Sequence, residues 1–262
     1  MKKLMFAAAV AAGLAAFGEG IESANSVGYT TKTVAADTFY LIGVQFEKIG
    51  QDGVAGLNDV LIMKGIEPVA YDNMFTDAAR IDVLVGNAYQ QYFYINDADD
   101  GTESYNLTGW ADGAGNLIST ADLAIGDGFW FHAPTVSAGA TLTVAGQVTE
   151  STEITLNVPS GNAFVIRANP FPLAVNLKDV ATSGITAVAY DNMFTDAARI
   201  DVLVGNAYQQ YFYINDADDG TESYNITGWS DGAGNAVDAN VIEVGASFWI
   251  NSPAAGTLTF TR

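Results

Sequence analysis

The sequence has no cysteine, a single histidine and few basic residues. Its 262 residues include 10 Lys and Arg against 30 Asp and Glu, for a formal net charge of −20. Without cysteine there are no disulfides and no thiolate metal ligands, so each folded unit must be stable through its hydrophobic core. A strongly acidic chain is repelled by nucleic acid and by anionic lipid surfaces, and we therefore expect no nucleic-acid partner.

Residues typical of catalytic sites are equally sparse. A lone histidine, His132, cannot build the usual zinc site without cysteine, nor a histidine-based triad. Several carboxylates occur twice along the chain, but nothing in their spacing selects a pair for acid–base catalysis. Only 15% of the residues are charged and 49% are hydrophobic, which is typical of a folded protein. We predict a folded protein that is not an enzyme.

Long hydrophobic runs are missing except at the start. Two lysines precede the apolar run Leu4–Phe17, and small residues follow near Gly18. This pattern predicts a cleaved secretory signal peptide over residues 1–20. The run is shorter than the ~20 residues that a membrane-spanning helix needs. We expect export to the cell surface or the medium, with no transmembrane segment in the mature chain.

What the sequence does contain is a long internal repeat. Residues 69–116 recur as residues 188–235, with only two differences over 48 positions. The repeat continues weakly on both sides: Phe129-Trp130 returns as Phe248-Trp249, and residues 39–46 align with 164–171. A repeat of this length indicates duplicated structural units. We predict two domains, at residues 21–149 and 150–262.

The local patterns favour β-structure. Ala140–Val144 and Glu153–Val158 alternate between apolar and polar residues, and Asp-Gly and Gly-Asn pairs lie between such runs. Helical character is confined to Asn73–Arg80 and its copy Asn192–Arg199, each long enough for a single turn. The predicted fold class is all-β, with two tandem, duplicated β-sandwich or partly open β-barrel domains. Each would hold about seven to nine mostly antiparallel strands.

The densest acidic cluster falls within the repeat. Hard oxygen ligands at alternating positions suit Ca²⁺, although the spacing is not that of an EF-hand. The other interpretation is a solvated hairpin loop whose Asp and Asn residues form turns. If Ca²⁺ is the cofactor, its ligands are Asp97, Asp99, Asp100 and Glu103, with Asp216, Asp218, Asp219 and Glu222 in the copy.

An aromatic strand gives a second candidate site. Residues 89–95 have strand composition, so neighbouring side chains point to opposite faces. If Phe93 and Ile95 face the core, the tyrosines on the other face can stack on sugar rings. Alternatively, both faces are buried, one in the core and one against the other domain. The candidate carbohydrate-binding residues are Tyr92, Tyr94 and Trp110, with Tyr211, Tyr213 and Trp229 in the copy. Phe129-Trp130-Phe131 is interpreted as a core strand in which the tryptophan fills a layer between sheets.

A family resemblance accompanies these patterns. Asn169-Pro170-Phe171-Pro172, followed by Gly245–Trp249, resembles the "GNPFP … GxGFWV" β-units of Gram-negative cell-surface proteins, and the first half shows the pattern more weakly at Gly126–Trp130. The resemblance implies a non-catalytic surface module. We therefore expect a secreted structural or adhesive protein, with a carbohydrate-binding module protein as the alternative. Its partners would be glycans, other cell-surface proteins, or further copies joined through edge strands.

Overall fold

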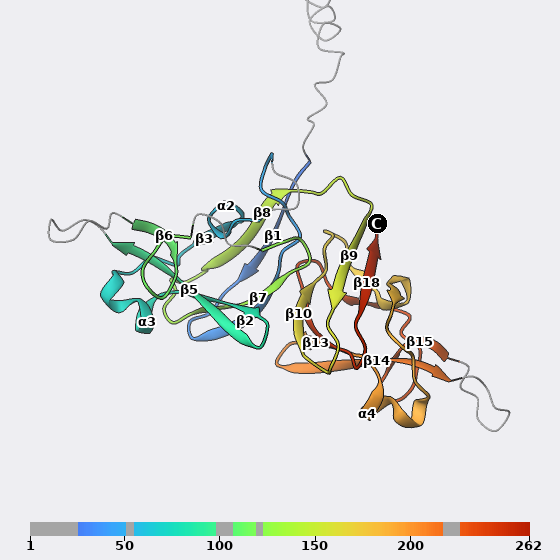
Figure 1. Cartoon of the computed structure of the whole chain (residues 1–262). Coiled ribbons are helices and arrows are strands. Elements are labelled where there is room, and N and C mark those ends of the chain that lie inside the picture. The colour runs from blue at the N-terminus through green and yellow to red at the C-terminus, as the bar shows by residue number, and fades with distance from the viewer. Residues whose placement is uncertain (1–25, 51–54, 98–106, 119–122, 217–225) are drawn as a thin grey trace, which may run out of the picture.

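The computed structural model describes residues 26–50, 55–97, 107–118, 123–216 and 226–262 (Figure 1). The predicted signal peptide lies outside these residues. The first half forms, in chain order, β1 (Val27–Thr33), β2 (Thr38–Gly43), α2 (Leu57–Val60), β3 (Leu61–Lys64), η1 (Tyr71–Asn73), α3 (Met74–Asp77), β4 (Arg80–Val85), β5 (Ala88–Asp97), β6 (Leu107–Ala111), β7 (Gly128–Ala133) and β8 (Thr141–Gln147).

The second half repeats this order with small changes. It forms β9 (Glu153–Val158), β10 (Val165–Ala168), β11 (Val175–Asn176), η2 (Leu177–Asp179), β12 (Ala181–Ser183), η3 (Tyr190–Asn192), α4 (Met193–Asp196), β13 (Arg199–Val204), β14 (Ala207–Asp216), β15 (Ile226–Asp231), β16 (Asn240–Ile242), β17 (Ser247–Asn251) and β18 (Gly256–Thr261).

The sheets confirm the all-β prediction. The first half has a five-stranded sheet, ordered β2-β7-β4-β5-β6, and a three-stranded sheet, β1-β8-β3. The second half has the matching sheets β10-β17-β13-β14-β15 and β12-β18-β9, plus the pair β11-β16. All strand pairings among these elements are antiparallel, and none of the sheets so described closes on itself. The arrangement is that of two similar, sandwich-like halves.

Local chemistry explains the strand connections. β4 and β5 are joined by a two-residue Gly-Asn turn in which Gly86 has a φ of 62°, and Gly205 repeats this turn with 64°. Positive φ at the first turn residue suits the tight hairpins that match strand twist, and glycine adopts it without steric cost. The single helical turn expected after Asn73 forms as α3, and its copy forms as α4.

Each half has its own hydrophobic core. In the first half Phe46, Ile81, Phe129 and Phe131 are fully buried within one cluster. The second half has the corresponding cluster around Phe248 and its neighbours. Side chains from alternate strand positions build both cores, as expected for one face of a pleated sheet. The final strand, β18, is paired on both sides, with β12 and β9.

The two halves meet through contacts that come in matched pairs (Figure 1). Gly43 N–H donates to Gly245 C=O at 3.0 Å, and the aligned Ala168 N–H donates to Gly126 C=O at 2.7 Å. Gly128 is packed so closely that an added Cβ would lie 2.4 Å from the Oγ of Ser247, its own counterpart in the repeat. Equivalent residues therefore face one another across the junction.

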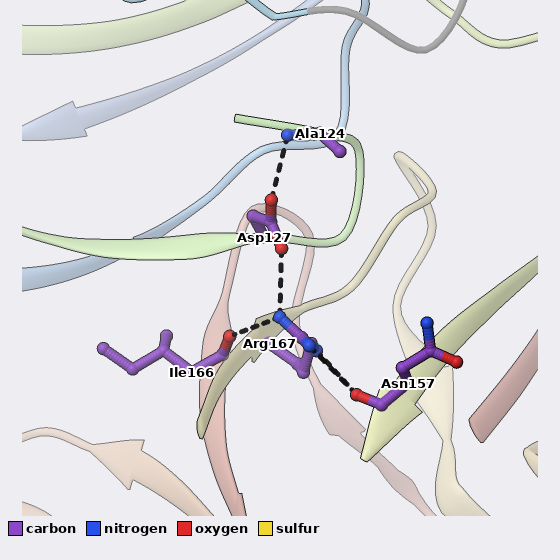
Figure 2. A network of polar contacts seen from close by, with 5 residues as sticks. All are labelled: Ala124, Asp127, Asn157, Ile166 and Arg167. Atoms are coloured by element: carbon purple, nitrogen blue, oxygen red, sulfur yellow. Dashed lines mark hydrogen bonds and ion pairs between the residues drawn. The ribbon is translucent and has the colours of Figure 1, made fainter. Parts of the chain in front are cut away.

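One ion pair reinforces this junction (Figure 2). The Nη1 of Arg167, from the second half, lies 3.0 Å from the Oδ1 of Asp127, from the first. The same guanidinium donates to the Asn157 carbonyl from Nε and Nη2, both at 3.0 Å. The other oxygen of Asp127 accepts from Ala124 N–H at 2.9 Å. The pair thus links the loop before β7 to strands β9 and β10.

Among the residues that the structure describes, there is no helix with the length and apolar character needed to cross a membrane.

Candidate binding surface

The aromatic rings predicted to bind carbohydrate are mostly core residues. Tyr92 is 7% exposed and Trp110 is 1% exposed; Tyr211 and Trp229, in the copy, are each 3% exposed. Tyr92 and Trp110 belong to the same cluster as the central phenylalanines of the first half. The exposed aromatic faces that a sugar would need are not present at these four positions, which corrects the expectation that they form a surface platform.

Tyr94 and Tyr213 are half-buried against the same tryptophans. The Tyr94 ring is tilted on Trp110 with centroids 5.5 Å apart, and Tyr213 lies 5.2 Å from Trp229. Burial raises the pKa of Tyr94 above its usual value, and the nearby Glu67 carboxylate adds to the shift. These rings therefore fill the margin of each core.

The opposite face of the aromatic strand is also covered. Phe93 and Ile95 pack with Met74 of the α3 turn in a small second cluster. The alternative interpretation of this strand, with both faces buried, is the one the structure shows. The second layer comes from the helical turn of the same half and not from the other half of the chain.

The exposed face of the five-stranded sheet carries a different group of residues. Trp130 was expected to fill the core, but Phe129 and Phe131 do so, and Trp130 points to the other side, where it is half-buried. The strand register places it beside residues from β4 and β5 on that face. We call this group the aromatic–arginine cluster; it consists of Phe39, Arg80, Asp82, Tyr89, Gln91 and Trp130.

The cluster is held by stacking and by a charge pair. The Arg80 guanidinium lies 5.7 Å from the Phe39 ring centroid. Its Nε and Nη2 approach the two oxygens of Asp82 at 2.8 and 3.0 Å. Gln91 Nε2 donates to Asp82 Oδ1 at 3.0 Å, and the Trp130 ring meets Phe39 edge-on at 6.4 Å. The charges cancel locally, while 48% of Phe39 stays exposed.

The second half reproduces this arrangement. Arg199 lies 5.1 Å from the Phe164 ring and pairs with Asp201 at 2.9 and 3.0 Å. Trp249 meets Phe164 edge-on at 6.1 Å and donates from Nε1 to the Tyr208 hydroxyl at 3.3 Å. The six equivalent residues are Phe164, Arg199, Asp201, Tyr208, Gln210 and Trp249.

Tyr89 marks the end of the first cluster nearest the junction. Burial raises the pKa of its hydroxyl; a hydrogen bond with Trp130 opposes the shift, and the Asp82 carboxylate and the hydroxyl of Tyr208 add to it. Tyr208 is the counterpart of Tyr89 in the repeat. The tyrosine end of each cluster lies next to the junction, because the hairpin turns beside Tyr89 and Tyr208 each border the other half.

At the other end the clusters differ. His132 stacks on Phe39 at 4.3 Å and its Nε2 lies 3.1 Å from Asp37 Oδ1. Asn251 takes its place in the second half, and its Oδ1 is buried without a hydrogen-bond partner among the described residues. The single histidine is therefore a variable neighbour of the cluster.

The predicted Ca²⁺ loops cannot be placed. Asp97 and Asp216 end β5 and β14, but their side chains and the remaining candidate ligands lie outside the described residues. Among the residues that are described, no three His, Cys, Asp or Glu side chains come together as a metal site.

Comparison with known protein families, curated proteins and solved structures found no match for this chain. The fold and the surface therefore define its class, an all-β protein of two similar halves that displays the same cluster twice.

Proposed function

We propose that the chain is an exported, non-catalytic structural or adhesive protein of the cell surface. The observation that carries this proposal is that both halves present the same side chains to solvent. Phe39 and Phe164, which lie outside the near-identical block, are 48% and 38% exposed, and each contacts a half-buried tryptophan, Trp130 or Trp249, that also lies outside it. Large apolar side chains gain nothing from exposure to water, so a set repeated on both halves favours a contact surface.

The duplication itself suits adhesion. Two equal surfaces on one chain engage a dense target together, and the second contact is then effectively intramolecular, which can raise retention by about 10²–10⁴ over one contact. The matched contacts between the halves hold both surfaces in a fixed relation. Glycans and other surface proteins of the same or a neighbouring cell are the proposed partners.

A second copy of the chain is the other candidate partner. β1 is an edge strand of its sheet, and on it Val27 and Tyr29 are 63% and 74% exposed. An edge strand offers unpaired backbone groups to another strand. Tyr29→Lys should abolish any self-association seen by sedimentation of the purified chain, whereas an unchanged profile would exclude this edge.

The location and the adhesive role have a direct test. Intact cells that produce the full chain are treated with protease and then fractionated, with a cytoplasmic enzyme as the control. The chain should be digested while the control survives, and cells that lack the chain should detach more easily from the surface they colonise. A chain found only in the cytoplasm, or unchanged attachment without it, would end the proposal.

A further inference from the structure

We infer that each aromatic–arginine cluster is a binding site for a neutral saccharide. This inference rests on the proposed surface function and assigns a ligand class to it. It uses rings different from those first suggested by the sequence, because those rings lie in the cores.

The first support comes from residues that are the same in both halves even though the sequence around them differs. Strand β2 reads Thr-Phe-Tyr-Leu-Ile-Gly and its counterpart reads Ala-Phe-Val-Ile-Arg-Ala, so only Phe39 and Phe164 agree. Strands β7 and β17 share a phenylalanine and then Trp130 and Trp249. A core tolerates drift between hydrophobic residues of similar size. The shared phenylalanine of β7 is fully buried, but Phe39 is 48% and Phe164 38% exposed.

Recent copying does not explain this persistence. Residues 69–116 and 188–235 are nearly identical throughout, so agreement there has no weight by itself. Phe39 and Trp130 lie on either side of that block, in strands free to change. A requirement at the surface, where each phenylalanine faces an arginine, accounts for the retention of the phenylalanine and the tryptophan.

The second support is the chemistry of the cluster. The CH-rich face of a pyranose ring packs on an aromatic side chain, and its hydroxyls need nearby donors and acceptors. Phe39 and Trp130 supply the rings, and Arg80 and the exposed Gln91 supply donors and acceptors that the buried Asp82 holds in place. Aromatic surface with a few well-placed polar groups is the usual composition of a small-molecule site.

Charge selects among saccharides. Arg80 is paired with Asp82 within the cluster, so no net positive charge remains to attract an anionic sugar. The whole chain carries −20, which repels polyanions further. The cluster extends over the four neighbouring strands β2, β7, β4 and β5, about 14 Å at the usual strand spacing. That width suits several sugar units of a neutral polysaccharide lying on the sheet.

The test is affinity electrophoresis of the full chain through gels that contain starch, hydroxyethyl cellulose, galactomannan or mixed-linkage β-glucan, with alginate as the anionic comparison. The wild-type chain should be retarded in at least one neutral gel and not in alginate. Phe39→Ala with Phe164→Ala should weaken retardation and raise the apparent Kd for the polysaccharide at least tenfold. Phe75→Ala with Phe194→Ala is the matched control, because it also removes two exposed phenylalanines, but from outside the aromatic–arginine clusters. This control should be retarded as strongly as the wild type.

A second pair of variants guards against misfolding. If circular dichroism shows that the Phe39/Phe164 variant is unfolded, Gln91→Ala with Gln210→Ala, which removes polar groups from an exposed part of the sheet, takes its place with the same expectation. The saccharide assignment would be overturned by no retardation in any neutral gel, by retardation only in alginate, or by an equal loss of retardation in the Phe75/Phe194 control. The cell-surface proposal would then stand or fall separately, on the protease and attachment results.

Discussion

Trp110→Ala separates a core tryptophan from a ligand platform. A tryptophan of this burial removes about 200 Å² from water, which at about 25 cal/mol per Å² corresponds to roughly 5 kcal/mol as an upper estimate. Substitutions of buried Phe and Trp by alanine usually cost about 3–5 kcal/mol, because the cavity collapses only in part. With Trp110 only 1% exposed, we expect a loss in that range from the free energy of unfolding of the first half.

The assay is equilibrium unfolding in urea, followed by near-ultraviolet circular dichroism. Trp229→Ala is the matched variant, and it should cost a similar amount in the second half, because Trp229 is 3% exposed and packs on Tyr213 as Trp110 packs on Tyr94. Trp130→Ala is the contrasting variant. Its half-buried ring should cost about 1–2 kcal/mol, since less of its surface leaves water on folding.

The result that would refute the reasoning is a small effect at Trp110. A loss below about 1 kcal/mol, combined with loss of saccharide retardation, would mean that the ring is accessible in solution and acts as a platform. If Trp130→Ala lowered the free energy of unfolding more than Trp110→Ala does, the core and surface faces assigned to the five-stranded sheet would have to be exchanged.

Three further predictions concern the junction, a turn and the acidic loops. Arg167→Ala breaks the partly exposed ion pair with Asp127, so it should lower the free energy of unfolding by about 1 kcal/mol or less. It should also increase the radius of gyration measured by small-angle scattering. An unchanged scattering curve would contradict the role of Arg167 in holding the halves together. Burial would raise the pKa of Asp112, but hydrogen bonds from Asn116 and Ala114 outweigh it and hold the pKa below 3.8. The charged carboxylate therefore stabilises the folded chain above pH 3.8, and this stabilisation is lost as the pH falls through the folded-state pKa. The difference in Tm between wild type and Asp112→Asn should shrink towards zero below that pKa. If the acidic loops bind Ca²⁺, the ion at 100 times Kd should stabilise the chain by about 2.7 kcal/mol, and identical melting curves in EDTA and in excess Ca²⁺ would exclude a structural site.

The architecture could be predicted from the sequence because its signals are local. Alternating strands and Gly-Asn turns depend on residues close in the chain, and the long repeat is visible when the sequence is compared with itself; together they indicate duplicated all-β units. The single helical turn after Asn73 was predictable for the same reason.

The face of each strand could not be predicted, because it depends on partners far away in the chain. Alternation shows that Tyr92 and Phe93 point in opposite directions, but both are aromatic, and both faces of this strand are covered. In Phe129-Trp130-Phe131 the largest ring looked like the best core residue. The informative neighbour of Trp130 is Asp82, a charged residue opposite it on β4, and the sequence does not reveal that pairing.

The matched contacts between the halves have a consequence for assembly. An interface in which each surface patch meets its own equivalent is isologous, and it is complete once two units have joined. Here both units belong to one chain, so the molecule has the design of a homodimer fused end to end. Gly128 and Ser247 are already opposite each other, and no third unit can add through the same patch. Any larger assembly of this protein must grow from a surface other than this junction.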